Sequence, residues 1–480
     1  MVTKTILALL IPILVGQASG NLNIYPAPEG IHASDKFQVY LSQGGQPQSS
    51  FTYITTSDKR AKETPTAKAK RGRSVSWTSF SFSGGAVTVE IHTPQDFHNC
   101  IVRPQHYGYK CQRTGNKTAY VTVSSTSRMM SVEFDYDYGS SSEDIKDKML
   151  IFADPPESNV PNEHDSSVLF YKAGVQKLNG QVHLNNSIKT IYLAPAAWVE
   201  GGFLTTANHG VTFRGRGILS ARSYKWKDDQ FTTTATLDVD KGGNHVIEGI
   251  VIVDPHHFFF RGRSSCNIIR NVKMIAPWAH NSDGVVLGRY GLVEDTFIWA
   301  NDDSLKVYAD NLVVRRCVVW QAQNGAVFQF GWSAKRYVQN VRISDVDVIH
   351  TDWCTFKKSK CHLSTNNAVL DLGGREVTSF KVNDIVISNI RIESSCPRLV
   401  YFKMDPASTG SVTNMHFNNW FVESQTAHEI LHNEIQGAFN ASLSDWTFTN
   451  LKIAGECISS PCQADFRLGH HTENINFRCD

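Results

Sequence analysis

The sequence predicts an all-β protein, in which an antiparallel β-sandwich is followed by a parallel β-helix. Short alternating strands separated by Gly, Ser, Asn and Pro fill the first part of the chain, as is typical of a sandwich with one solvated face. From about residue 170 a strand-rich repeat begins, without amphipathic helical stretches. We therefore expect a signal peptide over residues 1–20, a sandwich domain over 21–165 and a β-helix domain over 166–480.

The N-terminus has the features of a secretory signal peptide. Lys4 precedes an apolar run over residues 6–15, and the small residues Ala18 and Gly20 suit cleavage by signal peptidase. The run is too short to span a bilayer, and no later stretch is apolar for long enough to do so. We expect a secreted, soluble and monomeric protein with no membrane partner. The net charge of +2 gives no indication of nucleic-acid binding.

The ten cysteines agree with an oxidising compartment. None has the Cys-x-x-Cys spacing of a zinc site. The pairing of four cysteines stays open, namely Cys266, Cys317, Cys396 and Cys479. Three other pairs lie close enough in sequence to close short loops: Cys100 with Cys111, Cys354 with Cys361, and Cys457 with Cys462.

Two further features of the sequence concern the surface. Glycosylation sequons begin at Asn116, Asn185 and Asn440. The basic run over residues 59–73 could bind polyanions, but a solvated loop is the interpretation that we prefer. The segment over 138–165 is rich in Asp, Ser, Glu and Pro and is expected to link the two domains.

The second part of the chain repeats a polar lead-in, an alternating strand and a turn. Copies begin at residues 245, 267, 291 and 311, which are 22, 24 and 20 residues apart. This period indicates a parallel β-helix, because the Leu-x-x-Leu-x-Leu frame of leucine-rich repeats is absent. Several Asn residues fall at the same point of the repeat, where stacked amides could form a ladder.

Three aspartates mark the most informative stretch, residues 281–308. Asp283 belongs to an Asn-Ser-Asp-Gly motif and Asp302 and Asp303 to an Asn-Asp-Asp motif, with one strand of the repeat between them. Because consecutive rungs of a β-helix lie about 4.8 Å apart, this spacing places the three carboxylates on one face. A single Asp beside Gly or Ser is commonly a turn residue, but three of them one repeat apart indicate a site.

Clustered carboxylates without a metal are suited to glycoside hydrolysis. One carboxyl, kept protonated by its neighbours, donates a proton to the leaving oxygen, and another activates water or attacks directly. We therefore expect no cofactor and no metal. The alternative that stays open is a calcium-dependent lyase, in which Lys306 or Arg289 would act as the base.

Tryptophans near the aspartates divide into two groups. Trp278 and Trp332 lie in expected loops and are candidates for stacking against sugar rings. Trp299 and Trp320 end strands, so we expect them in the core.

Several of these motifs resemble glycoside hydrolase family 49, which contains dextranases and isopullulanases. They are Asp283-Gly, the Asp302-Asp303 pair followed by Ser-Leu-Lys-Val-Tyr, and Phe-Gly-Trp at 330–332, with similar segments at 77–80, 131–135, 150–153 and 345–350. The resemblance implies a β-sandwich followed by a right-handed parallel β-helix. It also implies an endo-acting, inverting hydrolase of α-glucans such as dextran (α-1,6) or pullulan (α-1,4).

The resemblance also implies roles for residues at matching positions. Asp302 would be the general acid, while Asp283 and Asp303 would position and activate water. Lys306 and Tyr308 belong to the same motif. Together with Gln329, Trp278 and Trp332, they are expected to contact the polysaccharide.

The chain also departs from the family pattern. Asn301 and Ser304 replace an Asp and a Gly of the acidic run, and Gln329 replaces an acidic residue before Phe-Gly-Trp. The glucan linkage therefore stays open.

Two alternatives to this function are weighed against the same residues. Pectin hydrolases of family 28 share the Asn-x-Asp and Asp-Asp motifs, but their Gly-His-Gly and Arg-Ile-Lys motifs are absent here. A non-catalytic secreted protein that binds carbohydrate or matrix would not require the aspartates, and their presence disfavours it.

Overall fold

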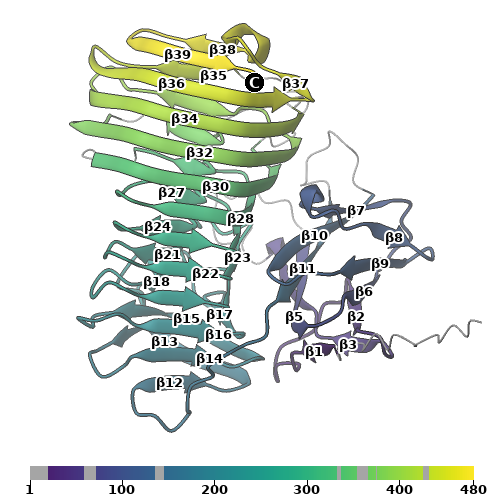
Figure 1. Ribbon diagram of the computed structural model, residues 1–480. Helices are drawn as coiled ribbons and strands as arrows, with labels where there is room; N and C mark the ends of the chain where they lie inside the picture. Colours follow the sequence, from purple (N-terminus) through teal and green to yellow (C-terminus); the bar gives the residue numbers. More distant parts are fainter. Residues whose placement is uncertain are drawn as a thin grey trace, which may run out of the picture.

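In the computed structural model, the described residues are 20–58, 72–135, 145–331, 337–353, 366–373, 376–424 and 432–480. Regular structure in these residues is almost entirely β-strand, arranged in two small sheets and one very large one (Figure 1). Short 3-10 helices occur at η1 (Gln105–Tyr107) and η3 (Pro461–Ala464). None of the helices among these residues is long and apolar enough to cross a membrane. The expected signal peptide, except Gly20, and residues 59–71 of the basic run lie outside the described residues.

The N-terminal domain is a sandwich of two mainly antiparallel sheets, as the sequence predicts. Strand β6 alternates buried and half-buried residues, the pattern expected when one face packs on a core. The six-stranded sheet contains β1 (Asn21–Ile24), β4 (Tyr53–Thr56), β5 (Ser74–Ser83), β7 (Cys100–Arg103), β10 (Arg128–Phe134) and β11 (Asp147–Asp154). The five-stranded sheet contains β2 (Gln38–Ser42), β3 (Gln48–Ser50), β6 (Val87–His92), β8 (Cys111–Arg113) and β9 (Thr118–Val123).

The third sheet coils into a parallel β-helix, which rises beside the sandwich in Figure 1. Its strands pair in parallel with the strand one rung further on, apart from the antiparallel contact of β36 with β37. The 28 strands that the described residues contribute are β12 (Val168–Tyr171), β13 (Gly174–Leu184), β14 (Thr190–Leu193), β15 (Ala197–Thr205), β16 (Thr212–Gly215), β17 (Ile218–Ser220), β18 (Ala235–Asp238), β19 (Val246–Glu248), β20 (Val251–Val253), β21 (Phe258–Gly262), β22 (Ile268–Arg270), β23 (Lys273–Ile275), β24 (Val285–Leu287), β25 (Leu292–Glu294), β26 (Phe297–Ala300), β27 (Leu305–Lys306), β28 (Val313–Gln321), β29 (Phe328–Gln329), β30 (Tyr337–Thr351), β31 (Leu370–Gly373), β32 (Phe380–Ser395), β33 (Val400–Lys403), β34 (Thr409–Ser424), β35 (Asn433–Gln436), β36 (Asn440–Ile453), β37 (Glu456–Cys457), β38 (Phe466–Leu468) and β39 (Thr472–Arg478).

An amide ladder runs along one turn of the later rungs. Asn450 donates from its amide to Asn419 at 3.3 Å, and Asn419 donates to Asn389 at 3.1 Å. These three residues have φ between 54° and 56°, a left-handed conformation that Asn tolerates better than most residues. The predicted stacking of Asn side chains at one point of the repeat is thus confirmed.

The sandwich packs against the side of the β-helix through a shared apolar cluster. Trp299 and Trp320 stack there with ring centroids 3.8 Å apart, so their expected place in the core is confirmed. Buried polar contacts cross the same boundary: the hydroxyl of Thr55 donates to Asp254 at 2.6 Å, and Lys273 pairs with Asp154. Other members of the apolar cluster are Tyr53, Trp77 and Phe152 from the sandwich, and Trp198, Val251 and Trp278 from the β-helix.

The disulfides confirm one expected pair and correct another. Cys100 and Cys111 are joined, as the sequence predicts. The expected bond from Cys457 to Cys462 is wrong, because Cys457 is joined to Cys479 with 6.1 Å between their Cα atoms. Strand β37 folds back along β36, the same strand that pairs with β39, and this brings Cys457 beside the residue that follows β39. Cys462 lies exposed on η3 instead.

The remaining cysteines and the sequons are placed as follows. Cys266, Cys317 and Cys396 form no disulfide in the described part of the chain. The asparagines of the three sequons, residues 116, 185 and 440, are exposed, and their glycosylation stays a prediction. Cys354 and Cys361 lie outside the described residues.

Candidate active site

The three aspartates lie in the turns that precede two neighbouring strands of the β-helix. Asp283 comes just before β24, and Asp302 and Asp303 come just before β27. The two strands are in register, and the backbone N–H of Gly284 donates to the carbonyl of Asp303 at 2.9 Å. A Cβ atom at Gly284 would lie 2.2 Å from the carbonyl oxygen of Ser304, so the close approach of the two turns requires glycine.

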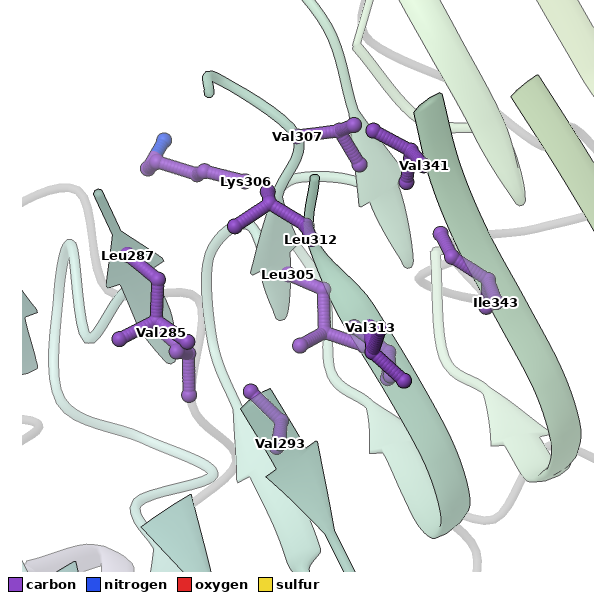
Figure 2. Close-up of a pocket in the computed structure, with 11 residues that line it drawn as sticks. Val285, Leu287, Val293, Leu305, Lys306, Val307, Leu312, Val313, Val341 and Ile343 are labelled. Atoms are coloured by element: carbon purple, nitrogen blue, oxygen red, sulfur yellow. The ribbon is translucent and has the colours of Figure 1, made fainter. Parts of the chain in front are cut away.

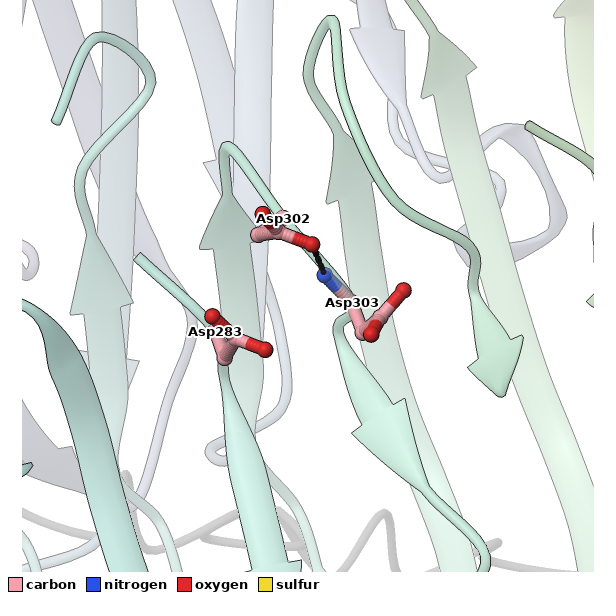
Figure 3. A group of neighbouring side chains, drawn as sticks. All are labelled: Asp283, Asp302 and Asp303. Atoms are coloured by element: carbon pink, nitrogen blue, oxygen red, sulfur yellow. Dashed lines mark hydrogen bonds between the residues drawn. The ribbon is translucent and has the colours of Figure 1, made fainter. Parts of the chain in front are cut away.

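This stacking brings the carboxylates together, as the spacing of the motifs predicts. One carboxylate oxygen from each aspartate lies within 4.8 Å of the others. All three side chains are buried, with 1–4% of their surface exposed. Figure 3 shows Asp283 and Asp303 on neighbouring turns, with Asp302 beside them and accepting a hydrogen bond from the backbone N–H of Asp303.

Lys306 supplies a positive charge between two of the aspartates. Its ammonium group lies 2.7 Å from Asp283 and is also paired with Asp303. The rings of Phe258 and Tyr308 each lie 5.6 Å from the same nitrogen. Although burial opposes its charge, the two carboxylates raise the pKa of Lys306 well above its ordinary value. Lys306 therefore stays protonated and holds Asp283 and Asp303 in place.

Strand alternation explains the direction of the Lys306 side chain. Its neighbours in sequence face the interior of the β-helix, where they line an apolar cavity of about 10 Å³ (Figure 2). Figure 2 shows the amine of Lys306 pointing away from these apolar side chains. The cavity is thus a packing gap under the site.

Asp302 differs from the other two aspartates because it has no ion pair with Lys306 among the described contacts. One of its oxygens accepts hydrogen bonds from the amides of Asn281 (3.0 Å) and Asn324 (2.7 Å). The other oxygen accepts from the backbone N–H of Asp303 at 2.9 Å. Burial and the nearby charge of Asp303 raise the pKa of Asp302 to about 6.

Asp283 presents an oxygen that accepts no hydrogen bond from a described residue. Its Oδ2 is paired with Lys306, but its buried Oδ1 has no hydrogen-bond partner. Burial and the two neighbouring aspartates raise the pKa of Asp283 well above its ordinary value, although Lys306 opposes this rise. In Asp303, by contrast, Oδ1 accepts from the backbone N–H of Ala326 at 3.0 Å and Oδ2 is paired with Lys306.

The geometry disfavours the calcium-dependent lyase. A cation held by the three carboxylates would lie next to the ammonium group of Lys306. Lys306 with a raised pKa is also a poor base. Arg289, the other candidate base, is exposed and paired with Asp310 at 3.2 Å.

The residues expected to contact the substrate differ in their position and exposure. Tyr308 is half-buried and its hydroxyl donates to Gln329, which is buried one rung further on. Trp278 is 2% exposed and packs in the cluster between the domains, so the expectation that it stacks against a sugar is wrong. Its loop turns inward toward the sandwich, which a loop-like sequence does not reveal. Trp332 lies outside the described residues.

Sequence reasoning missed several polar side chains around the carboxylates. Asn281 belongs to the same motif as Asp283, so its contact with Asp302 could have been found from the repeat spacing. Asn324 comes from the next turn, where no motif marks it. A third group consists of Trp226 and His257 from the preceding turns and His280 from the turn of Asp283.

Comparisons with known proteins agree with this architecture. Residues 22–170 match the model of the glycosyl hydrolase family 49 N-terminal Ig-like domain. The chain is 28% identical over 406 residues to an isopullulanase of Aspergillus niger, covering 72% of this chain and 71% of that protein. It is 24% identical over 493 residues to a dextranase of Arthrobacter globiformis, covering 82% of this chain and 75% of that protein.

A solved structure shows the same fold along almost the whole chain. It is Dex49A from Penicillium minioluteum, with a TM-score of 0.73 and 19% identity over 95% of this chain and 96% of that one. The domain match and the two relatives confirm the resemblance that the aspartate motifs predict. Residues 22–170 thus match the N-terminal domain of glycoside hydrolase family 49, and most of the chain is similar to a dextranase and an isopullulanase.

Proposed function

We propose that this chain is a secreted, endo-acting and inverting hydrolase of an α-glucan such as dextran or pullulan. The observation that carries the proposal is that Lys306 forms ion pairs with two of the three buried carboxylates, Asp283 and Asp303. Two carboxylates are held beside an ammonium group, while Asp302 is held by neutral hydrogen-bond donors, and burial and Asp303 raise its pKa to about 6 against the pull of Lys306. The family relatives named dextranase and isopullulanase support an α-glucan as the substrate.

Asp302 acts as the general acid. Protonated Asp302 gives its proton to the glycosidic oxygen while the bond from that oxygen to the anomeric carbon breaks. Asn281 and Asn324 hold the carboxyl in place, and because an amide offers both N–H groups and a carbonyl oxygen, they suit either protonation state.

Asp283 and Asp303 activate the water. The unpartnered Oδ1 of Asp283 accepts a proton from the water, whose oxygen forms the new bond to the anomeric carbon. Asp303 is fixed by the backbone N–H of Ala326 and by Lys306, and it orients the same water.

The proposal also predicts the configuration of the product at the anomeric carbon. Inverting glycosidases typically hold their carboxyl groups about 6.5–9.5 Å apart and retaining ones about 5–5.5 Å apart. The nearest oxygens here lie within 4.8 Å, so spacing alone favours retention. We propose inversion, as the family resemblance implies, with Lys306 holding Asp283 and Asp303 in place beside the water.

Endo-action is supported by the position of the site along the β-helix. Outward-facing residues continue from Lys306 to Gln329, Asp371, Tyr401 and Glu434 on successive rungs. Rungs also precede the site, since β18 and β21 stack before β24. The carboxylates thus lie within the stack rather than at its end, as internal cleavage of a long chain requires.

The activity is tested by incubating the protein separately with dextran, pullulan and polygalacturonate while reducing ends are followed. We expect release from at least one α-glucan and none from polygalacturonate, with Asp302→Asn as the matched inactive control. NMR before mutarotation should show inverted configuration at the anomeric carbon. Release from polygalacturonate alone would move the assignment to a pectin hydrolase, and a first product with retained configuration would make one aspartate a nucleophile. A glucan retained on an affinity gel but never cut would identify a binding protein.

A further inference from the structure

The turns that carry the aspartates continue toward the N-terminal rungs. Each strand from β18 to β29 on this face follows a turn, and successive turns hold Trp226, His257, Asp283, Asp303 and Asn324. His280 shares a turn with Asp283. Because rungs lie about 4.8 Å apart, Trp226 and His257 are about 10 Å and about 5 Å from the level of Asp283 along the stack.

Trp226, His257 and His280 form one cluster, which we call the Trp226 cluster. The indole centroid lies 5.1 Å from the ring of His280 and 6.1 Å from that of His257, both in edge-to-face orientations. Lys227 lies over the indole at 4.4 Å from its centroid. Trp226 is half-buried, so part of it faces the solvent. None of these side chains has a role in the proposed proton transfers.

Two buried nitrogen atoms in the Trp226 cluster have no hydrogen-bond partner among the described residues. They are Nδ1 of His257, a residue that is 7% exposed, and Nε1 of Trp226. A buried polar atom without a partner costs about 1–3 kcal/mol, so native structures rarely leave one without a reason. A bound ligand would supply the partner for both atoms.

The chemistry of the cluster matches a neutral sugar. An indole offers an apolar face together with an N–H donor, and an imidazole offers a donor and an acceptor, the groups that the C–H face and hydroxyls of a hexose require. Burial, with His256, Lys227, His280 and Lys306 nearby, lowers the pKa of His257 to about 3. Burial and Lys227 also lower the pKa of His280. The ring of His257 is therefore neutral in mild acid, and the charged form of His280 is disfavoured.

We propose that Trp226, His257 and His280 form a subsite for a neutral glucosyl unit, on the N-terminal side of the catalytic carboxylates. This inference rests on the proposed function, because the same glucan chain would extend from the carboxylates along the stack to Trp226. Because Trp226 and His257 lie one to two rungs before Asp283, only substrates with additional glucosyl units on that side reach them.

The experiment measures binding by calorimetry to the full chain carrying Asp302→Asn, so that the ligand is not cut. The probes are linear oligosaccharides of increasing length from the α-glucan that the wild-type protein cleaves or, if it cleaves none, from dextran and pullulan in turn. In this background Trp226→Ala should weaken binding of the longer oligosaccharides by roughly tenfold, as for one or two lost contacts, and leave the shortest ones unchanged. Trp226→Phe keeps an aromatic face but loses the N–H, and it should retain part of the affinity.

Two further variants separate binding from folding. His257→Asn keeps a side chain that can donate and accept, so it should bind better than His257→Ala. Phe439→Ala removes a side chain that is 82% exposed near the C-terminal rungs, and it should match the parent at every length. In the otherwise wild-type enzyme, Trp226→Ala should raise KM for the polymer while turnover of a short activated glycosyl fluoride is unchanged.

The outcomes separate this subsite from the proposed function. If the wild-type protein cleaves an α-glucan while Trp226→Ala and His257→Ala bind every length like the parent, the subsite is wrong and the function stands. An equal loss at every length would also overturn the subsite, since it would indicate a structural role. If the Asp302→Asn protein binds no α-glucan and the wild-type protein cuts none, both proposals fail.

Discussion

Two buried clusters of charge lie in this molecule, and they are built in opposite ways. At the boundary between the domains, Arg103 of the sandwich donates to Glu133 at 3.1 Å and to Glu393 of the β-helix at 2.9 Å. His350 contacts Glu133 at 2.7 Å, and the backbone N–H of Gln105 donates to Glu393 at 2.6 Å. Each buried carboxylate there has two partners, one on each oxygen. In the aspartate cluster, three carboxylates share one ammonium group.

The difference shows in the affinity of the carboxylates for protons. Although burial opposes it, His350 and Arg103 lower the pKa of Glu133. Burial and Asp303 raise the pKa of Asp302 to about 6 instead. Glu393 shifts in the same direction as Asp302, because burial raises its pKa to about 7 against the pull of Arg103. The contacts with Arg103 and His350 thus keep Glu133 ionised, whereas Asp302, whose hydrogen-bond donors are all neutral, can hold and release a proton.

The largest difference between the two clusters is expected in how substitutions within them change turnover. Asp302→Asn should lower the rate on the glucan by about 10²–10⁴, the usual contribution of general acid catalysis, with binding nearly intact. A glycosyl fluoride, whose leaving group needs no proton, should be far less affected. Asp283→Asn should slow both substrates alike. Arg103→Met is the control from the other cluster and should leave kcat of the folded protein unchanged. Equal losses on both substrates for Asp302→Asn would remove it from the role of acid.

The second effect is on stability and belongs to the other cluster. Arg103→Met leaves Glu133 and Glu393 buried beside an apolar side chain, and it should lower the free energy of unfolding by about 3–5 kcal/mol. Chemical denaturation with a probe of each domain measures this. Arg263→Met is the matched control, because Arg263 is exposed and its pair with Asp240 contributes less than about 1 kcal/mol. A loss for Arg103→Met as small as for the control would show that the boundary does not depend on this cluster.

The third effect is the pH dependence of stability, which has opposite signs in the two clusters. The folded protein holds the proton of Asp302 up to about pH 6, whereas the unfolded chain loses it near pH 4. The ionised Asp302 therefore costs stability above pH 6, and a rise of about two units corresponds to about 3 kcal/mol. Asp302→Asn should raise the free energy of unfolding by up to that amount above pH 6 and by little near pH 4.

Ionisation of Glu133 has the opposite effect on the free energy of unfolding. Because its pKa is lowered in the folded state, its ionised form stabilises the protein above the ordinary glutamate pKa, and this contribution is lost as the pH falls through the lowered value. Glu133→Gln should therefore destabilise the protein at neutral pH. Denaturation curves for both variants across this pH range check the pair, and the same sign for both would refute the distinction between the clusters.

How far the sequence predicts this molecule depends on whether a feature repeats. The stacked turns that hold Asp283 and Asp303 are one period of the repeat apart, so their meeting follows from the spacing of the two motifs alone. The amide ladder through Asn389 and Asn419 follows in the same way. Residues that are one repeat apart in sequence lie one rung apart in space, because each rung adds the same rise.

Features that depend on packing between domains, or on the end of the stack, could not be derived. Trp278 reads as a loop residue, and only the sandwich lying against the β-helix explains its burial. Cys457 pairs with Cys479 because a hairpin closes the last rung, which no repeat predicts. Arg103 and Glu393 are 290 residues apart in sequence, and neither belongs to a motif.

The smallest effect is the pH dependence of turnover, and it addresses the proton of Asp302 directly. If protonated Asp302 is the acid, kcat/KM on the glucan should fall above about pH 6, by roughly tenfold per unit, because the fraction that carries the proton falls by that factor. This descending limb should be absent when the substrate is a glycosyl fluoride. Arg103→Met should leave the position of the limb unchanged, because the boundary cluster takes no part in the proton transfer. A rate on the glucan that stays constant up to pH 8 would show that the proton for the leaving oxygen comes from another group.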